Sequence, residues 1–148
     1  MEIQKVTSAD LEAVTSLVSE VSKKDVLPLL NQQGQKEYIE RVLPDLATTF
    51  DTDRFLSIKA VSNGNLIGFA ALREGNYLTH LFVSNSSQGS GLGRDLLSYL
   101  LNTTNANEIS LRSSINAADF YSHCGFVATS EESEFNGIRF IPMSLVRT

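Results

Sequence analysis

Three glycines at alternate positions are the residues of this sequence best suited to chemistry. Gly89, Gly91 and Gly93 lie in the segment 88–94, Gln-Gly-Ser-Gly-Leu-Gly-Arg. Glycine leaves the neighbouring backbone N–H groups uncovered by a side chain. The leucine-rich run that begins at Leu92 predicts a helix whose positive dipole end faces the same place. The segment therefore predicts a binding site for a phosphate or pyrophosphate group.

Two other phosphate-binding motifs do not fit this segment. The P-loop requires a lysine followed by serine or threonine after its last glycine, whereas Gly93 is followed by Arg94 and Asp95. The dinucleotide-binding pattern G-x-G-x-x-G would need a third glycine where the sequence has Arg94 or Leu96. These departures disfavour a nucleotide-binding protein. A separate alternative is that the glycines form a tight turn that holds no ligand.

Composition narrows the class of protein. The 148 residues, 42% of them hydrophobic and 20% charged, suffice for one globular domain, which we expect to span residues 1–148. The net charge of −5 disfavours nucleic acid as a partner, because phosphate neutralisation needs a basic face. There is no membrane-spanning apolar run or signal peptide, and the single cysteine, Cys124, cannot form an internal disulfide. We therefore expect a cytoplasmic protein.

Hydrophobic periodicity places helices and strands on both sides of the loop. Thr7 and Asp10 form a capping box before the first helix, residues 22–25 break its pattern, and Pro44 should end or kink the second helix. Helices are predicted over 11–21, 35–47, 92–101 and 117–124, and strands over 3–6, 55–61, 66–72, 77–83, 109–112, 126–130 and 138–145. The order β-α-α-β-β-β-α-β-α-β-β predicts an α/β (α+β) fold, a mixed sheet with helices on both faces.

Two further blocks flank the glycine loop. The first is 78–83, Leu-Thr-His-Leu-Phe-Val, and the second is 114–126, Ser-Ile-Asn-Ala-Ala-Asp-Phe-Tyr-Ser-His-Cys-Gly-Phe. With the Gln-x-x-Gly-x-Gly pattern of the loop, they resemble the GNAT acyl-CoA N-acetyltransferase superfamily. Ser114 stands where that family most often has asparagine. The resemblance implies a single GNAT-like domain with a mostly antiparallel sheet of about seven strands.

The resemblance also implies a cosubstrate, acetyl-CoA, and no metal. The pantetheine arm would lie along the strand before the loop, and the pyrophosphate on the loop's N–H groups. Ser114 and Asn116 would make polar contacts to the arm. The residues implied in binding are Leu81, Phe82, Val83, Gln88, Gly89, Ser90, Gly91, Leu92, Gly93, Arg94, Ser114 and Asn116.

Tyr121 takes the position of the family's general acid. A phenol with a pKa near ~10 is protonated at neutral pH and could protonate the thiolate that leaves when an amine attacks the thioester. A backbone N–H of the segment 81–83 would hold the carbonyl oxygen. His80, beside the predicted acyl site, and Glu74, acting through water, are candidates for the base. Alternation directs His80 to the same side as Leu78 unless a bulge intervenes.

The sequence is compatible with several alternatives. Tyr121 could be a packed aromatic beside Phe120, and the chain could be an acyl-CoA-binding sensor or subunit without turnover. The acceptor, a small-molecule or protein amine, would enter between segments 22–35 and 131–138. Homodimers through the terminal strands are common in the family, and the sequence does not decide for or against one.

Overall fold

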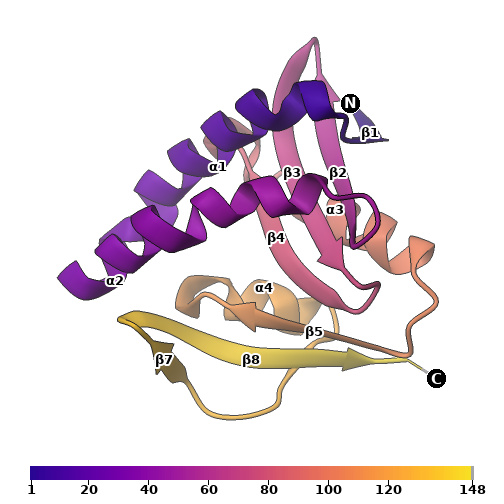
Figure 1. The fold of residues 1–148 in the computed structure, drawn as a ribbon. Helices are drawn as coiled ribbons and strands as arrows, with labels where there is room; N and C mark the ends of the chain where they lie inside the picture. The colour runs from indigo at the N-terminus through magenta and orange to yellow at the C-terminus, as the bar shows by residue number, and fades with distance from the viewer. Residues whose placement is uncertain (148) are drawn as a thin grey trace.

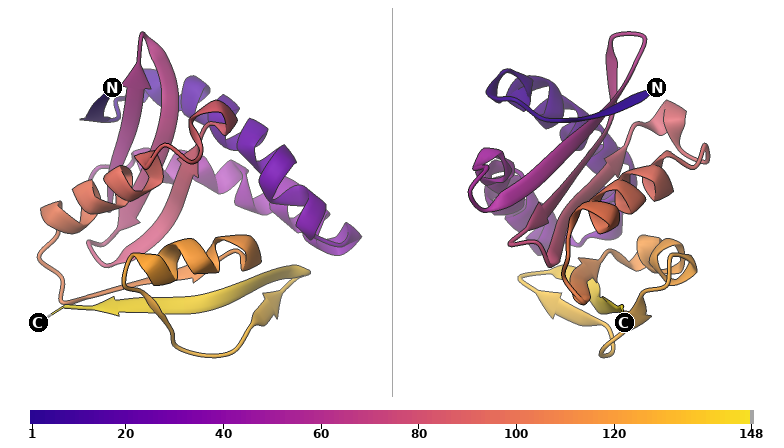
Figure 2. Two further views of the ribbon diagram at one scale, coloured as in Figure 1. Left: turned by 180° about the vertical axis from the view of Figure 1, so that it is seen from behind. Right: turned by 90° about the vertical axis from the view of Figure 1, so that its right-hand side faces the viewer.

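The structure is a computed structural model that describes residues 1–147. The sheet runs in the order β1-β2-β3-β4-β5-β8-β6, and β7 also pairs with β8. Helices α1 and α2 cover one face, whereas α3 and α4 cover the other (Figures 1 and 2). The elements are β1 (Glu2–Lys5), α1 (Leu11–Asp25), α2 (Gln32–Glu37), β2 (Phe55–Ser62), β3 (Asn65–Arg73), β4 (Tyr77–Val83), α3 (Leu92–Thr103), β5 (Glu108–Ser113), α4 (Ala118–His123), β6 (Val127–Ala128), β7 (Ser133–Phe135) and β8 (Ile138–Val146). The predicted fold class is confirmed, and β7 is the strand that the periodicity did not predict.

The sheet splits between β4 and β5. These two strands pair in parallel only at Tyr77–Ser110 and Leu78–Leu111, and then separate (Figure 1). Beyond Leu78, β4 continues along β3 while β5 continues along β8. The edge of β4 that faces β5 is therefore left without a strand partner from Thr79 to Val83.

Two clusters of buried side chains hold the layers together. On one face, Val14, Val18 and other residues of α1 pack on Phe69 of β3. On the opposite face, the leucines of α3 pack on Ala70 and Leu72, which alternation points away from Phe69. Each leucine that is fully buried contributes about 1.5–3 kcal/mol. Because β4 pairs with β3, this packing also fixes the position of the start of α3 relative to β4.

The helical region before β2 differs most from the prediction. Helix α1 continues to Asp25, through the predicted break, because Ser22 is fully buried and its hydroxyl bonds that of Tyr38 at 2.6 Å. The second helix begins earlier, at Gln32, and passes into a π-helical turn over Tyr38–Val42 and a 3-10 helix over Pro44–Phe50. The helical pattern of residues 35–47 predicts that Ile39 faces inward, but Ile39 is 52% exposed, since it lies about 100° around the helix from buried Tyr38.

Helix α2 touches the hairpin turn between β7 and β8 through two glycines. A Cβ atom on Gly34 would lie 2.3 Å from the carbonyl oxygen of Gly137, and one on Gly137 would lie 2.4 Å from the nitrogen of Gly34. The turn Asn136-Gly137 has positive φ at both residues, as a two-residue hairpin requires. The close approach brings α2 into contact with the start of β8. Over residues 1–147, no helix is long and apolar enough to cross a membrane.

Candidate active site

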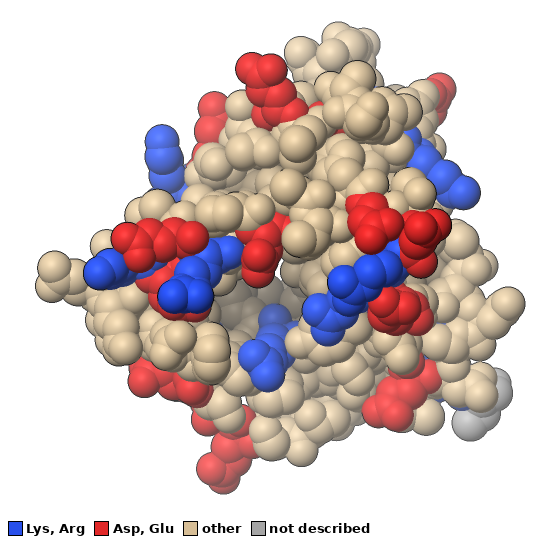
Figure 3. Space-filling view, in the orientation of Figure 1, with Lys and Arg blue, Asp and Glu red and all other residues tan. Residues whose placement is uncertain are grey.

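A cavity of about 930 Å³ opens where β4 and β5 separate. Its walls come from the end of α1 and the turns that follow it, from β4 and the glycine loop, and from β5, α4 and β8. Figure 3 shows the hollow near the centre of one face, with basic and acidic side chains on its rim. The predicted cosubstrate-binding residues, together with Tyr121 and His80, all line this cavity.

The glycine loop presents unpaired backbone donors to the cavity. Gly89 and Gly91 have φ angles of 82° and 88°, and a Cβ atom at either position would meet nothing within 4 Å. Gly91 is the N-cap of α3, and no hydrogen bond among the described residues uses the N–H groups of Gly91, Leu92 or Gly93. These donors lie at the positive end of the helix dipole, and buried Leu92 anchors the helix to the sheet. The arrangement fits a bound anion such as a pyrophosphate.

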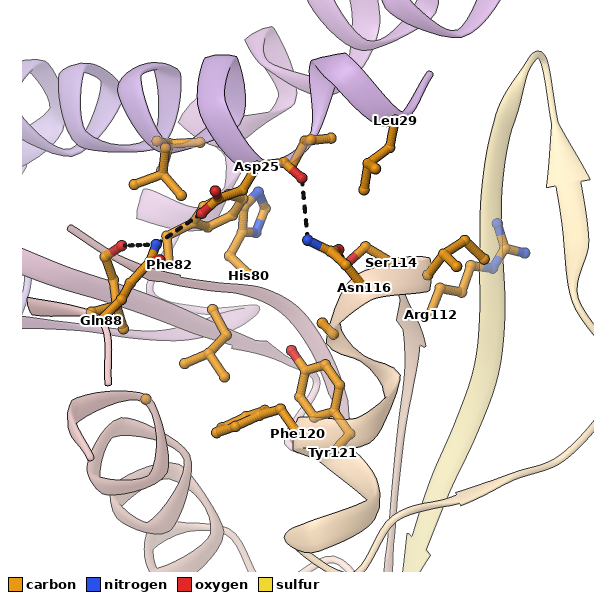
Figure 4. A pocket seen from close by; sticks show the side chains of 18 of the residues that line it. Asp25, Leu29, His80, Phe82, Gln88, Arg112, Ser114, Asn116, Phe120 and Tyr121 are labelled. Atoms are coloured by element: carbon orange, nitrogen blue, oxygen red, sulfur yellow. Dashed lines mark hydrogen bonds between the residues drawn. The ribbon is translucent and has the colours of Figure 1, made fainter. Parts of the chain in front are cut away.

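Asp25 connects the two sides of the cavity. Its carboxylate accepts a hydrogen bond of 2.8 Å from the side-chain amide of Gln88. Its backbone carbonyl accepts a hydrogen bond of 3.3 Å from the side-chain amide of Asn116 (Figure 4). Gln88 also donates to the carbonyl of Val83 at 3.2 Å, and the hydroxyl of Ser114 donates to Asn116 at 2.8 Å. Asp25 is 63 residues from Gln88 and 91 from Asn116, so no local pattern could have indicated its place here.

Tyr121 combines a packed ring with a hydroxyl that faces the cavity. The side chain is only 8% exposed, and its ring packs edge-on against Phe120 and Phe126, with centroids 5.2 and 5.8 Å away. Its phenol oxygen points into the cavity (Figure 4). Burial, with a smaller contribution from Cys124, raises the pKa of Tyr121 above its usual value. The phenol is therefore protonated throughout the neutral pH range.

A β-bulge decides where His80 points. Ala71 of β3 pairs with His80 and Leu72 pairs with Leu78, which leaves Thr79 as the extra residue. The bulge places His80 on the face opposite Leu78. There its ring packs edge-on against the ring of Phe69, with the two ring centroids 5.9 Å apart. Alternation alone would have put His80 with Leu78, so that expectation is wrong and the bulged alternative is confirmed.

The surroundings of His80 keep its imidazole neutral. One ring nitrogen, Nδ1, lies 2.8 Å from the hydroxyl of Thr79. The ring is partly accessible from the cavity, yet burial among apolar side chains lowers its pKa to about 4. At neutral pH the imidazole can accept or donate a hydrogen bond but has little tendency to hold a second proton.

Glu74, the other candidate base, lies elsewhere. It is in the turn before β4, whereas the cavity borders the opposite end of that strand. Its carboxylate pairs with Arg54 at 3.1 Å and borders a separate hollow of about 440 Å³. A water-mediated role for Glu74 in this cavity is therefore wrong, because the length of β4 separates it from Tyr121.

The low pKa of His80 predicts a pH-dependent stability. An unfolded histidine binds a proton near pH 6.5, whereas folded His80 does so only near pH 4. The unfolded state thus binds more protons between these values, and the free energy of unfolding should fall as the pH drops through this window, by on the order of 2–3 kcal/mol. Urea unfolding at pH 7 and pH 4.5 should show a smaller fall in His80→Gln than in the wild type. The exposed His123 provides the control variant, His123→Gln, which should keep the wild-type fall; equal falls in all three proteins would contradict the assignment.

Two arginines on the wall opposite α1 were not predicted as site residues. Arg139 of β8 makes two hydrogen bonds with the carboxylate of Glu132, at 2.6 and 2.9 Å. Arg112 of β5 has its guanidinium 4.5 Å from the ring centroid of Phe140. Both side chains line the cavity, but they reach it from separate strands. No sequence pattern predicts that these two arginines line the same cavity.

Comparison with known proteins gives a consistent result. The model of the family described as Acetyltransferase (GNAT) domain matches residues 22–147. A search among curated proteins gives no significant match. Among solved structures, a GCN5-related N-acetyltransferase from Rhodopseudomonas palustris aligns with a TM-score of 0.78 at 20% identity, covering 98% of this chain and 94% of that one.

Two further structures extend the comparison. The PaiA N-acetyltransferase from Thermoplasma acidophilum, solved with coenzyme A, aligns with a TM-score of 0.75 at 19% identity, over 98% of both chains. The ribosomal-protein-alanine N-acetyltransferase from Brucella melitensis aligns with a TM-score of 0.69 at 17% identity, over 99% of both. At these identities the structures establish a shared fold.

Proposed function

The chain belongs to the acetyltransferase (GNAT) family, and from this premise we propose that it transfers an acetyl group from acetyl-CoA to a primary amine. One observation supports this most directly. The unpaired edge of β4, the unpaired N–H groups at the start of α3 and the phenol of Tyr121 all border one cavity. Together they supply a place for an extended arm, an anion site and a proton donor.

The cosubstrate would bind along the split in the sheet. Its pantetheine amides would pair with the free backbone groups of β4 from Leu81 to Val83, as an added strand does. Its pyrophosphate would accept hydrogen bonds from the loop, with Arg94 adding positive charge. Ser114 and Asn116, on the opposite side of the split, would contact the arm.

The reaction would proceed by direct attack. The neutral amine attacks the thioester carbonyl, and a backbone N–H of β4 stabilises the oxyanion of the tetrahedral intermediate. The C–S bond then breaks, and the Tyr121 phenol gives its proton to the departing sulfur. The proton lost by the amine nitrogen passes to water, and the phenolate of Tyr121 regains a proton from water. With a pKa of about 4, His80 acts as a hydrogen-bond partner of the amine or of that water and does not store the proton.

The alternative is an acyl-CoA-binding protein without turnover. Such a protein would need the loop and the split sheet but no acid. The phenol oxygen of Tyr121 faces the cavity, and no hydrogen bond to another residue within 1–147 accounts for it. The hydroxyl is accessible from the cavity, where a bound cosubstrate can reach it. Its presence favours catalysis over binding alone.

Titration calorimetry with acetyl-CoA tests the proposal. We expect micromolar binding of acetyl-CoA and no binding of ATP, because the loop lacks the lysine of a nucleotide site. Release of free thiol in the presence of an amine then reports turnover. Folded protein that binds no acetyl-CoA would refute the proposed function, and binding without thiol release for any amine would favour the non-catalytic alternative.

A further inference from the structure

Outside the glycine loop and the first turn of α3, which carries Arg94 and Asp95, the charged side chains that line the cavity lie on opposite walls. We propose that the acceptor is a small amine that also carries a carboxylate on an apolar body, as an apolar amino acid does, and that Arg112 binds the carboxylate. The inference rests on the proposed transfer to an amine and names the class of that amine.

Arg112 is available to an anionic ligand. It lies on β5 between Leu111 and Ser113, which are buried against the other face, so its side chain faces the cavity. It is exposed, and none of the ion pairs formed within residues 1–147 includes it. The ring of Phe140 supports the guanidinium from one side at 4.5 Å, which leaves the hydrogen-bonding edge of the group free. A guanidinium edge matches a carboxylate with two parallel hydrogen bonds.

The other cavity-lining cations have partners or a different place. Arg139 is neutralised by the two hydrogen bonds from its guanidinium to Glu132. Arg94 lies at the start of α3, beside the anion site of the loop. On the wall formed by β5 and β8, Arg112 is therefore the uncompensated positive charge among the described residues.

Asp25 supplies the opposite charge on the opposite wall. Its carboxylate accepts the amide of Gln88 but forms no ion pair with a described residue. Figure 4 shows Asp25 beside Gln88 on the cosubstrate side of the cavity and Arg112 on the far side. The carboxylate of an acceptor is repelled by Asp25 and attracted by Arg112. The amine of the same molecule is attracted toward Asp25 and away from Arg112. The two charges thus orient the amine toward the cosubstrate.

The surface between the two charges is apolar. The side chains that line it after α1 are Val26, Leu29 and Leu30, and those across from them are Phe135, Ile138 and Phe140. Leu29 and Phe135 are 48% and 56% exposed, and an apolar body at the mouth would cover them. Because the cavity of about 930 Å³ must also hold the pantetheine arm, the acceptor is a small molecule.

Matched pairs of amines test the inference. Each pair consists of an amino acid and the amine left when its carboxylate is removed: leucine with isoamylamine, phenylalanine with 2-phenylethylamine, and methionine with 3-(methylthio)propylamine. Rates are compared at equal concentrations of the neutral amine, because the amines differ in pKa. We expect kcat/KM for at least one amino acid to exceed that of its partner by about tenfold or more, mainly through KM.

Variants assign the preference to Arg112. Arg112→Gln should lower kcat/KM for the amino acid by about tenfold and far less for the amine, and Arg112→Lys should restore part of the preference. Arg54→Gln removes an exposed arginine that borders the separate hollow beside Glu74, and it should leave both values unchanged.

The outcomes separate this inference from the proposed function. If acetyl-CoA binds and amines react without any preference for a carboxylate, or if none of the three amino acids is acetylated, the acceptor class is wrong and the acetyltransferase proposal stands. Equal losses for both members of a pair in Arg112→Gln would also refute the role of Arg112. Absence of acetyl-CoA binding would instead refute the proposed function itself.

Discussion

Replacing Tyr121 with phenylalanine should lower kcat by about 10²–10⁴-fold, the usual contribution of a positioned general acid. The substitution removes one oxygen atom and keeps the ring that packs between Phe120 and Phe126. No hydrogen bond formed by that oxygen is lost within the described chain, so the free energy of unfolding should change little. Acetyl-CoA affinity by calorimetry should also be nearly unchanged, because the phenol acts only when the C–S bond breaks. Single-turnover thiol release with a responsive amine measures the effect.

Tyr38 provides the matched control for this experiment. It is also a buried tyrosine that lines the cavity, but its hydroxyl is bonded to that of buried Ser22 at 2.6 Å. Tyr38→Phe should therefore lower the free energy of unfolding by about 1–3 kcal/mol, since the Ser22 hydroxyl loses its partner, with little effect on kcat. Unchanged thiol release in Tyr121→Phe, or an equal fall in kcat in both variants, would remove the basis for Tyr121 as the acid.

Replacing Gly91 with glutamate should weaken acetyl-CoA binding by about 100-fold or more. The new carboxylate would stand in front of the unpaired N–H groups at the start of α3, where the pyrophosphate is proposed to bind. Like charges brought together in a binding site cost several kcal/mol, and each 1.4 kcal/mol corresponds to a tenfold change in Kd. Calorimetric titration with acetyl-CoA at constant ionic strength measures the loss.

The same substitution at Gly64 isolates the cause. Gly64 has a φ angle of 79°, close to the 88° of Gly91, and a Cβ atom at either position would meet nothing within 4 Å. Both variants therefore carry a similar backbone strain of about 1–2 kcal/mol and the same added charge, but Gly64 lies in the β2–β3 turn, outside the cavity. Gly64→Glu should bind acetyl-CoA normally. Equal weakening in both variants would mean that strain or net charge, and not the anion site, explains the loss.

Where a pattern depends on residues close together in the chain, the sequence alone was sufficient. The strand 77–83 was predicted with the boundaries that β4 has, and the helix after the glycine loop was predicted from its first residue, Leu92. The alternation of a strand and the periodicity of a helix are local properties, as is the φ freedom of glycine. These same local features carry the three blocks that resemble the GNAT family, so the family was also accessible from the sequence.

The tertiary structure decided how the side chains meet in the cavity. Thr79 is bulged out of register against β3, which turned His80 to the opposite face from Leu78. A bulge depends on the neighbouring strand, and strand periodicity does not report it. Packing of Ser22 against Tyr38 likewise extended α1 as far as Asp25, although the local sequence predicted a break.

The two charged residues of the proposed acceptor site are also brought together only by the tertiary structure. Asp25 and Arg112 come from segments almost ninety positions apart in the sequence, and each by itself has the appearance of an ordinary surface residue. They line one cavity because β4 and β5 separate and α1 crosses the opening. Local patterns in the sequence thus predicted most of the elements, the conformation of the glycine loop and the family. Only long-range packing decided which charged groups face the acceptor, because their positions depend on contacts between segments that local patterns do not encode.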